Sequence, residues 1–492
     1  MNVATAGIPH RPLRRGPSPV VLAGTFVGFV VAALLSAAGA PLFGLIAAVA
    51  VPTAAVLWSH PDAAVLLVMF MLYTNANVVA VKFHGVPMVI GAAVPALLLI
   101  PLWRDSIRTR RDIVLTPIVP LLFAFVLVQF AGAVVAVEPV DAVETVTTTL
   151  IEGLALYILV TNTVRTREEL ERVIWALLAA GVAMGLLTMF QHFTDTYSNP
   201  YYGFAQIAIP EQLVEQGVEV VNTTARQAGP LGETNRYAQI MGMLLPLSLT
   251  AFTLRRSRTA GILAAAAIAI IGSAAVLTLS RGIAVGLGIT FLVATVLGYV
   301  RIRYMLFCLG LGAILALVSP RVGQRVETLM EIASFVVKKS GPVDDAVRGR
   351  ATEMLAALEM FTEHPILGVG PGMYKYHYQM YARRIGGRVH QEERRSHNLY
   401  LDVAAENGLA GLVLLIAMGG LALRDLRRAR EALLETDPVA AQLATGFFMA
   451  ILAYFTTALF LHAAFIRYLW MIMALGAVAS RLQPAPSTGA TR

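Results

Sequence analysis

The sequence predicts an all-α membrane protein, a polytopic bundle of about 12–14 spanning helices with a partly helical loop outside the bilayer. Three observations predict this class. Only 14% of the 492 residues are charged, whereas a soluble domain carries roughly 25%. Mean hydropathy is +0.70. Apolar runs long enough to cross about 30 Å of hydrocarbon recur along the chain. Because these runs are long and do not alternate, they indicate helices and not a membrane barrel.

The individual spans follow from the apolar runs. Pro52 and Pro95 interrupt the second and fourth of them. The expected spans cover 20–39, 41–58, 62–80, 88–103, 114–136, 146–163, 172–193, 236–254, 260–279, 282–300, 304–319, 399–421, 441–460 and 464–480.

The arginine clusters between these runs predict the topology. If the N-terminus is cytoplasmic, every short cluster falls on the cytoplasmic side, as the positive-inside rule requires. The clusters are 104–111, 165–172, 255–258, 301–303 and 424–430. Both termini are then cytoplasmic. This placement also explains the formal net charge of +8 without nucleic acid as a partner.

Two longer loops lie on the outer side. The expected order is a cytoplasmic segment (1–19), membrane helices (20–193), a first outer loop (194–235), membrane helices (236–319), a large outer loop (320–398), membrane helices (399–480) and a disordered cytoplasmic tail (481–492). Within the large loop, Leu355 and Leu358 recur at helical spacing. They predict a helix over 350–363, lying on the membrane face or packed on a small core of the loop. His364-Pro365 ends it, because a residue before proline avoids the helical region.

Two outer-face arginines are candidate anion ligands. Arg281 is the only charged residue between Gly261 and Val300, and Ser280-Arg281-Gly282 forms the outer turn between two spans. A guanidinium binds phosphate oxygens bidentately, although an arginine at the hydrocarbon edge can also simply reach into the interface. Arg226 precedes a span on the same side, near Asn235. An ordinary solvated arginine is its alternative interpretation.

His397 is the candidate base. It stands where the large outer loop re-enters the membrane, after Arg394 and Arg395. These cations disfavour the protonated imidazole and so keep it neutral near pH 7. A neutral imidazole suits general-base catalysis, while a structural histidine is the alternative. Glu406, one turn into the next span, is a candidate hydrogen-bond partner.

No metal or other cofactor is expected. The histidines of the large outer loop lack ligand spacing with partner carboxylates. The single cysteine, Cys308, excludes an intramolecular disulfide and a thiolate metal cluster. Gly368-Val369-Gly370-Pro371-Gly372 resembles a phosphate-binding loop, but Pro371 and the missing strand–helix context favour a bend.

The ordered motifs of the second half resemble the O-antigen ligase and polysaccharide polymerase superfamily. The resemblance covers about 226–420, and Arg226, Gly229 and Asn235 look like its upstream arginine segment. One departure is Thr234, where the family frequently has proline. The other matching motifs are Ser280-Arg281-Gly282, the stretch 364–372, His397-Asn398-Leu399-Tyr400-Leu401 and the stretch 405–411.

The resemblance implies a GT-C-type glycosyltransferase of the bacterial inner membrane, with its active site on the periplasmic side. It would move a glycan from undecaprenyl diphosphate to an acceptor hydroxyl, on a growing glycan in polymerases or on lipid A–core in ligases. Arg226 and Arg281 would bind the diphosphate, and His397 would act on the acceptor hydroxyl. The implied reaction is metal-independent and inverting. Further substrate contacts are expected from Asn235, Arg395, Asn398 and Glu406.

Other functions remain open at this point. Polymerase is favoured over ligase because fourteen spans and a long outer loop suit a processive glycan channel. A protein glycosyltransferase of the same superfamily is a third possibility. A transporter or flippase is the competing class, but transporters carry polar residues at mid-membrane, whereas polar groups here gather at one face. The expected partners are the bilayer, the lipid-linked donor, a glycan or lipid A–core acceptor, a flippase and a chain-length regulator.

Overall fold

The computed structural model describes residues 19–37, 48, 51–53, 55–109, 112–208, 226–303, 345–386, 394–462 and 467–483. The chain divides into two compact units, one of residues 1–65 and 97–111 and the other of residues 66–96 and 112–492. We call them the N-terminal unit and the main unit. The helix α3 (Pro61–Tyr73) and the 3-10 helix η1 (Val94–Leu98) cross their boundaries.

The N-terminal unit contains α1 (Pro19–Ala37) and α6 (Leu99–Thr109). Arg104 Nη1 donates to the carbonyl oxygens of Trp58 and Ser59, at 2.8 and 3.2 Å. The Trp58 and Trp103 rings meet edge to face, with centroids 6.2 Å apart. These contacts join the segment before α3 to α6 within this unit.

The main unit is almost entirely helical. Its small sheet pairs β1 (Gln206–Ala208) and β2 (Arg226–Gly229) antiparallel. The helices are α4 (Ala76–His84), α5 (Met88–Ala92), α7 (Ile118–Ala133), α8 (Pro139–Thr148), the π-helix η2 (Thr149–Ala155), α9 (Leu156–Thr163), α10 (Arg167–Phe193), η3 (Tyr201–Gly203), α12 (Thr234–Thr253), α13 (Arg258–Leu277), α14 (Arg281–Val296), α17 (Asp345–Glu363), α18 (Tyr374–Arg384), α19 (Leu399–Leu433), α20 (Pro438–Thr457), η4 (Ala458–Phe460) and α21 (Arg467–Ala479).

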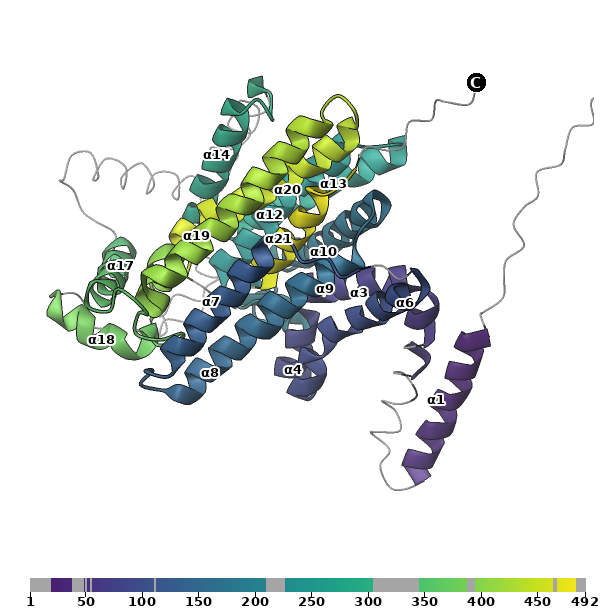
Figure 1. Ribbon diagram of the computed structural model, residues 1–492, viewed down its shortest axis with the longest axis horizontal. Coiled ribbons are helices and arrows are strands. Elements are labelled where there is room, and N and C mark those ends of the chain that lie inside the picture. Colours follow the sequence, from purple (N-terminus) through teal and green to yellow (C-terminus); the bar gives the residue numbers. More distant parts are fainter. Residues whose placement is uncertain are drawn as a thin grey trace, which may run out of the picture. The chain divides into compact units, whose positions relative to one another are not determined.

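The centre of the main unit is built on α12 and α20. Helix α12 packs against α13 and α20, and α20 also packs against α14, α19 and α21 (Figure 1). Small residues permit close approach: a Cβ at Gly286 of α14 would lie 2.8 Å from the backbone nitrogen of Thr457. Such close contacts are typical of helix pairs in membranes. The buried faces of α12 and α20 therefore form the core against which α13, α14, α19 and α21 pack.

The predicted all-α, polytopic membrane class is confirmed. Within the described residues, five helices are long and apolar enough to cross a membrane: 139–163, 167–193, 258–277, 399–433 and 438–460. Shorter apolar helices include α7, α14 and α21. The expected span 304–319 and most of 41–58 lie outside the described residues.

Several expected helices have different boundaries. The run 62–80 is broken after Tyr73, because Asn75 takes a left-handed conformation with φ 58°. The run 88–103 divides into α5, η1 and α6. The helix expected over 146–163 begins earlier, at Pro139, and contains the π-helical turn η2. The sequence analysis predicted neither the hairpin β1–β2 nor α18.

Helices α17 and α18 form a layer against the end of α19 (Figure 1). The expected helix 350–363 is present and ends at Glu363, directly before His364-Pro365. Its buried face differs from the one predicted, since Leu355 and Leu358 are 53% and 44% exposed. The residues that pack instead are Ala356, Ala357 and Met360 of α17 with Tyr374, Tyr378 and Tyr381 of α18. Of the two predicted placements, the structure shows the helix packed on a core.

The stretch 364–372 forms a bend, as predicted, and backbone contacts fix this bend to α19. The amides of Val369 and Gly370 donate to the carbonyl oxygens of Ala405 and Glu406, at 2.8 and 3.1 Å. Gly408 has φ 63°, and a Cβ there would lie 2.1 Å from the carbonyl oxygen of Ile366. The bend and the kink of α19 therefore require glycine for close approach.

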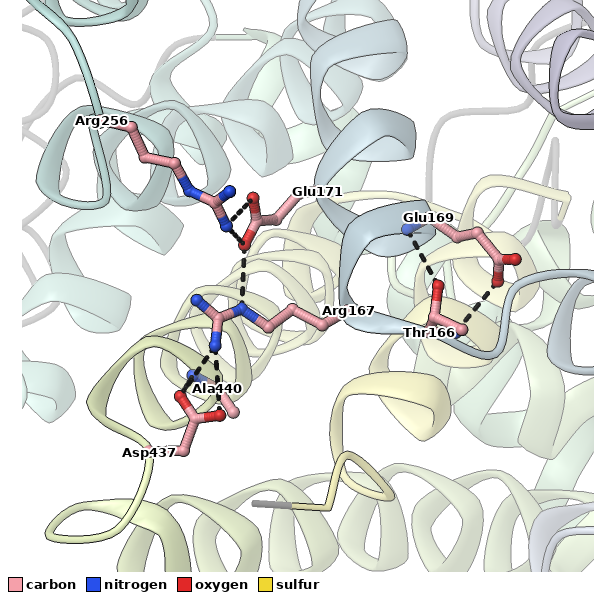
Figure 2. A network of polar contacts seen from close by, with 7 residues as sticks. All are labelled: Thr166, Arg167, Glu169, Glu171, Arg256, Asp437 and Ala440. Atoms are coloured by element: carbon pink, nitrogen blue, oxygen red, sulfur yellow. Dashed lines mark hydrogen bonds and ion pairs between the residues drawn. The ribbon is translucent and has the colours of Figure 1, made fainter. Parts of the chain in front are cut away.

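At the C-terminal end of α12, three connections between helices meet in an ion-pair network (Figure 2). Arg256 Nη2 lies 2.9 Å from Glu171 Oε2, and Arg167 bridges Glu171 to Asp437, with both distances 3.1 Å. Asp437 also caps α20 by accepting from the amide of Ala440. The loops around 167, 256 and 437 therefore meet at the C-terminal end of α12.

Candidate functional site

The N-terminal end of α12 joins three predicted segments. Arg226 Nε and Nη2 donate to the carbonyl oxygen of Thr278, at 3.2 and 3.1 Å, and Nη2 also donates to Asn235 Oδ1 at 3.3 Å. The Ser280 hydroxyl donates to the same Asn235 oxygen at 2.8 Å. The hairpin, the first turn of α12 and the turn between α13 and α14 are thus held together around Asn235.

Arg281 begins α14 directly after Ser280. The turn is tight, because Leu279 has φ 53° and a Cβ at Gly282 would lie 2.6 Å from the Cβ of Phe460. This close approach seats the start of α14 on η4. Arg281 is half-buried and stands beside the Asn235 network at one end and the segment 458–462 at the other.

His397 faces the buried carboxylate of Glu353, which lies on α17. Its Nε2 lies 3.7 Å from Glu353 Oε2, and the Glu353 side chain is 4% exposed. Arg394 Nη1 lies 4.0 Å from the other carboxylate oxygen of Glu353. His397 itself has φ 50°, a strained conformation of the kind that clusters at functional sites.

The environment keeps His397 neutral. Burial lowers the pKa of this imidazole to about 3, and the charges of Arg350, Arg394 and Arg236 act in the same direction. Desolvation and nearby cations both disfavour the imidazolium. The sequence analysis predicted a neutral imidazole from Arg394 and Arg395. The lowered pKa has burial as its main cause and includes Arg394.

His462 connects His397 to α12. Its ring packs edge to face against the ring of His397, with centroids 5.7 Å apart. Arg236 Nη2 donates to the carbonyl oxygen of His462, and Arg236 Nη1 donates to Gln239 Oε1 at 2.7 Å. Since Asn235 and Arg236 are consecutive, a continuous set of contacts links Arg226 to His397.

The other predicted contact residues have identifiable roles. Asn398 caps α19, because its Oδ1 accepts from the amides of Tyr400 and Leu401, both at 3.0 Å. Glu406 is buried, and its carboxylate accepts from the amides of Gly372 and Tyr374, at 2.9 and 3.1 Å. Arg395 is half-buried beside His397. Asn398 and Glu406 thereby fix the segment that presents His397.

Four residues of this region were missed from the sequence, namely Glu233, Arg236, Glu353 and His462. The sequence carries a signal for Glu353, because this residue shares a helix face with the buried residues at positions 356, 357 and 360. The prediction instead took the face of Leu355 and Leu358 as the buried one. Arg236 was readable as a charge at the start of a span. For Glu233 and His462 the sequence carries no comparable signal.

Within the described ranges, no three histidine, cysteine, aspartate or glutamate side chains come together as metal ligands. Residues 264–416 match a family described as O-antigen ligase. The matched segment contains Arg281, Glu353 and His397, and it excludes Arg226 and His462. A comparison with curated proteins gives no match. With its membrane-spanning helices, the chain is a multi-pass membrane protein, and its segment 264–416 is similar to the O-antigen ligase family.

Proposed function

We propose that this protein transfers a glycan from undecaprenyl diphosphate to an acceptor hydroxyl at the outer end of its helix bundle. One observation carries the proposal: a neutral, carboxylate-facing imidazole, His397, is linked through consecutive contacts to the arginine-bearing turns of Arg226 and Arg281. The match to an O-antigen ligase family supports glycosyl transfer as the reaction type.

The arginines would bind the donor. A diphosphate leaving group needs its developing charge stabilised, and preorganised guanidinium groups supply that stabilisation where water is excluded. The hydrogen bonds of Arg226 to Thr278 and Asn235 preorganise one of these groups. Because a diphosphate is a good leaving group once its charge is held, the proposed reaction needs no strong general acid and no metal ion.

His397 would activate the acceptor. Its neutral imidazole takes the proton of the acceptor hydroxyl, the oxygen forms a bond to the anomeric carbon, and the bond from that carbon to the diphosphate breaks. The electron pair leaves with the lipid diphosphate. A single in-line displacement of this kind inverts the anomeric configuration. Glu353 would orient the imidazole and stabilise the imidazolium, as carboxylates do beside catalytic histidines.

The proposed location is the bacterial inner membrane, with the site on the periplasmic face and both termini in the cytoplasm. The ion-pair network at 167, 171, 256 and 437 lies at the other end of α12 from the site, and its connections are the arginine-rich ones. The positive-inside rule assigns that end to the cytoplasm.

Polymerisation of a surface polysaccharide is the proposed outcome, and ligation to lipid A–core is the alternative favoured by the description of the matched family. The product distinguishes them. A ladder of lengthened, undecaprenyl-linked glycan indicates a polymerase, whereas glycan on lipid A–core indicates a ligase.

The test uses purified protein in proteoliposomes with lipid-linked glycan extracted from a deletion strain. Wild-type protein should form a new glycosidic bond in the presence of a chelator, and His397→Ala should lower the rate by about 10²–10⁴-fold. His364→Ala, at an exposed histidine of the bend, is the matched control. Lipid flipping without a new bond, or full activity in His397→Ala, would contradict the proposal.

A further inference from the structure

A second histidine at the site repeats the arrangement of the first. His462 Nε2 lies 3.9 Å from Glu233 Oε2, as His397 Nε2 lies 3.7 Å from Glu353 Oε2. The Nδ1 atoms of both histidines are buried and have no hydrogen-bond partner among the described residues. Glu233 is the residue directly before α12, so this second pair is fixed to the same helix end as Asn235.

The two carboxylates favour one tautomer of each ring through their charge, since separations of 3.7 and 3.9 Å are longer than a hydrogen bond. A carboxylate facing Nε2 favours the proton on that nitrogen, and the other ring nitrogen is then an acceptor with a free lone pair. Burial lowers the pKa of His462, and Arg236, His397 and Arg395 lower it further, so this ring is neutral as well. The Nδ1 atoms of His397 and His462 are therefore two hydrogen-bond acceptors without a donor among the described residues.

The charges around the two rings restrict what those donors are. Arg236 and Arg395 act on His462, while Arg350, Arg394 and Arg236 act on His397. Glu233 and Glu353 are the carboxylates that face the rings. An ammonium ligand would meet several like charges here, whereas a neutral hydroxyl donates a hydrogen bond without that repulsion.

We propose that His462, oriented by Glu233, binds a second hydroxyl of the acceptor beside the hydroxyl that reacts at His397. The acceptor is then a neutral polyhydroxyl compound, a sugar with two neighbouring hydroxyl groups, bound through two imidazole nitrogens. This inference rests on the proposed glycosyl transfer. It explains why a second buried imidazole lies against the base, since a buried acceptor atom is costly unless a ligand completes it.

The test compares three substitutions of His462 in the same proteoliposomes, with extracted lipid-linked glycan as the donor and a separately added glycan as the acceptor, so that the two concentrations are varied independently. His462→Phe fills the space without a nitrogen, His462→Gln keeps a polar group, and His462→Ala leaves a space for added imidazole. We expect His462→Phe to lower kcat/KM for the acceptor by about 10–100-fold, with the KM for the donor unchanged. Added imidazole should restore part of the rate of His462→Ala. His364→Phe is the matched control.

Each outcome separates this inference from the proposed function. Wild-type kinetics in His462→Phe would make His462 a packing residue and overturn the inference, while loss of transfer in His397→Ala would still support the function. A raised KM for the donor would assign His462 to the diphosphate and also overturn it. If His462→Phe or His462→Ala does not fold, His462→Leu carries the test, since wild-type acceptor kinetics without any polar group at this position would equally contradict it. His462→Gln keeps an oxygen that can accept the same hydrogen bond, so it should lose less than the apolar variants.

Discussion

The two ends of the helix bundle use arginine in different ways. At the end drawn in Figure 2, Arg167 and Arg256 bind the carboxylates of Glu171 and Asp437. At the other end, Arg226 and Arg236 donate to neutral oxygens, among them the carbonyl of Thr278. Hydrogen bonds to neutral oxygens hold a guanidinium in place and do not themselves neutralise its charge. Arg394, at the same end, lies 4.0 Å from the carboxylate of Glu353. The first arrangement joins loops, and the second suits an anionic ligand.

The largest expected effect separates the two ends directly. Arg281→Ala should lower the transfer rate by about 10²–10³-fold, the typical effect of removing one group that stabilises a developing anion. Arg256→Ala removes an exposed partner of Glu171 and should leave the rate unchanged. Arg281→Lys should also be poor, because an ammonium lacks the fork of donors. Equal rates in Arg281→Ala and Arg256→Ala would remove the distinction between the ends.

A smaller loss is expected when the carboxylate beside the base becomes neutral. Glu353→Gln keeps the shape of the side chain but removes its charge, so the imidazole loses both its orienting partner and the stabilisation of its protonated form. We expect the rate to fall by about 10–100-fold with little change in KM. Glu363→Gln, on the same helix but exposed, is the control. Steady-state kinetics that matched wild type would exclude Glu353 from the mechanism.

The pH profile tests the electrostatics of the site. The lowered pKa of His397, about 3, means that the base stays deprotonated, and the rate flat, as pH falls from 8 to about 5. Arg394→Ala removes a cation near the imidazole, so the pKa of His397 should rise and the acidic loss of rate should begin at higher pH. A profile that moved in the opposite direction would contradict the assigned role of Arg394.

The smallest effect is expected at the ion-pair network. Asp437→Asn keeps an oxygen to cap α20 and removes the ion pair between Arg167 and the buried Asp437, so the free energy of unfolding should fall by about 1–3 kcal/mol. Asp437→Ala also removes the cap and should cost about 1 kcal/mol more. Thermal unfolding in detergent measures both, and transfer activity should not change. A loss of activity in Asp437→Asn would connect the two ends.

The sequence predicted the long apolar helices that can span a membrane, but it did not predict the polar helix α18 or the break at Asn75. Helices α7, α10, α12 and α13 follow from long apolar runs, because spanning segments must be apolar and satisfy their own backbone. Helix α18 was missed because its sequence is polar, although Tyr374, Tyr378 and Tyr381 are buried on one face. Asn75, with φ 58°, breaks a run that composition alone reads as continuous.

The candidate site was predictable in part for the same reason. Arg281 and His397 stand out because charged or titratable groups are rare beside apolar runs, and the motifs around them resemble a family. Their partners Glu353 and His462 come from segments distant in sequence, and only packing brings them to the imidazole. Glu353 is positioned by the contact between α17 and the tyrosines of α18. The pattern of long apolar runs does not predict this contact, because α18 is polar in sequence.

The seating of α17 and α18 on α19 has a consequence for how the enzyme is assembled. The imidazole belongs to the segment directly before α19, whereas the carboxylate that faces it belongs to the layer of α17 and α18. Glu406 fixes that layer through the amides of Gly372 and Tyr374. In the proposed reaction, binding of the lipid diphosphate and activation of the acceptor hydroxyl would thus belong to separate parts of the structure. A helix bundle without the layer of α17 and α18 would retain the arginine-bearing turns but would lack Glu353, the carboxylate proposed to orient His397.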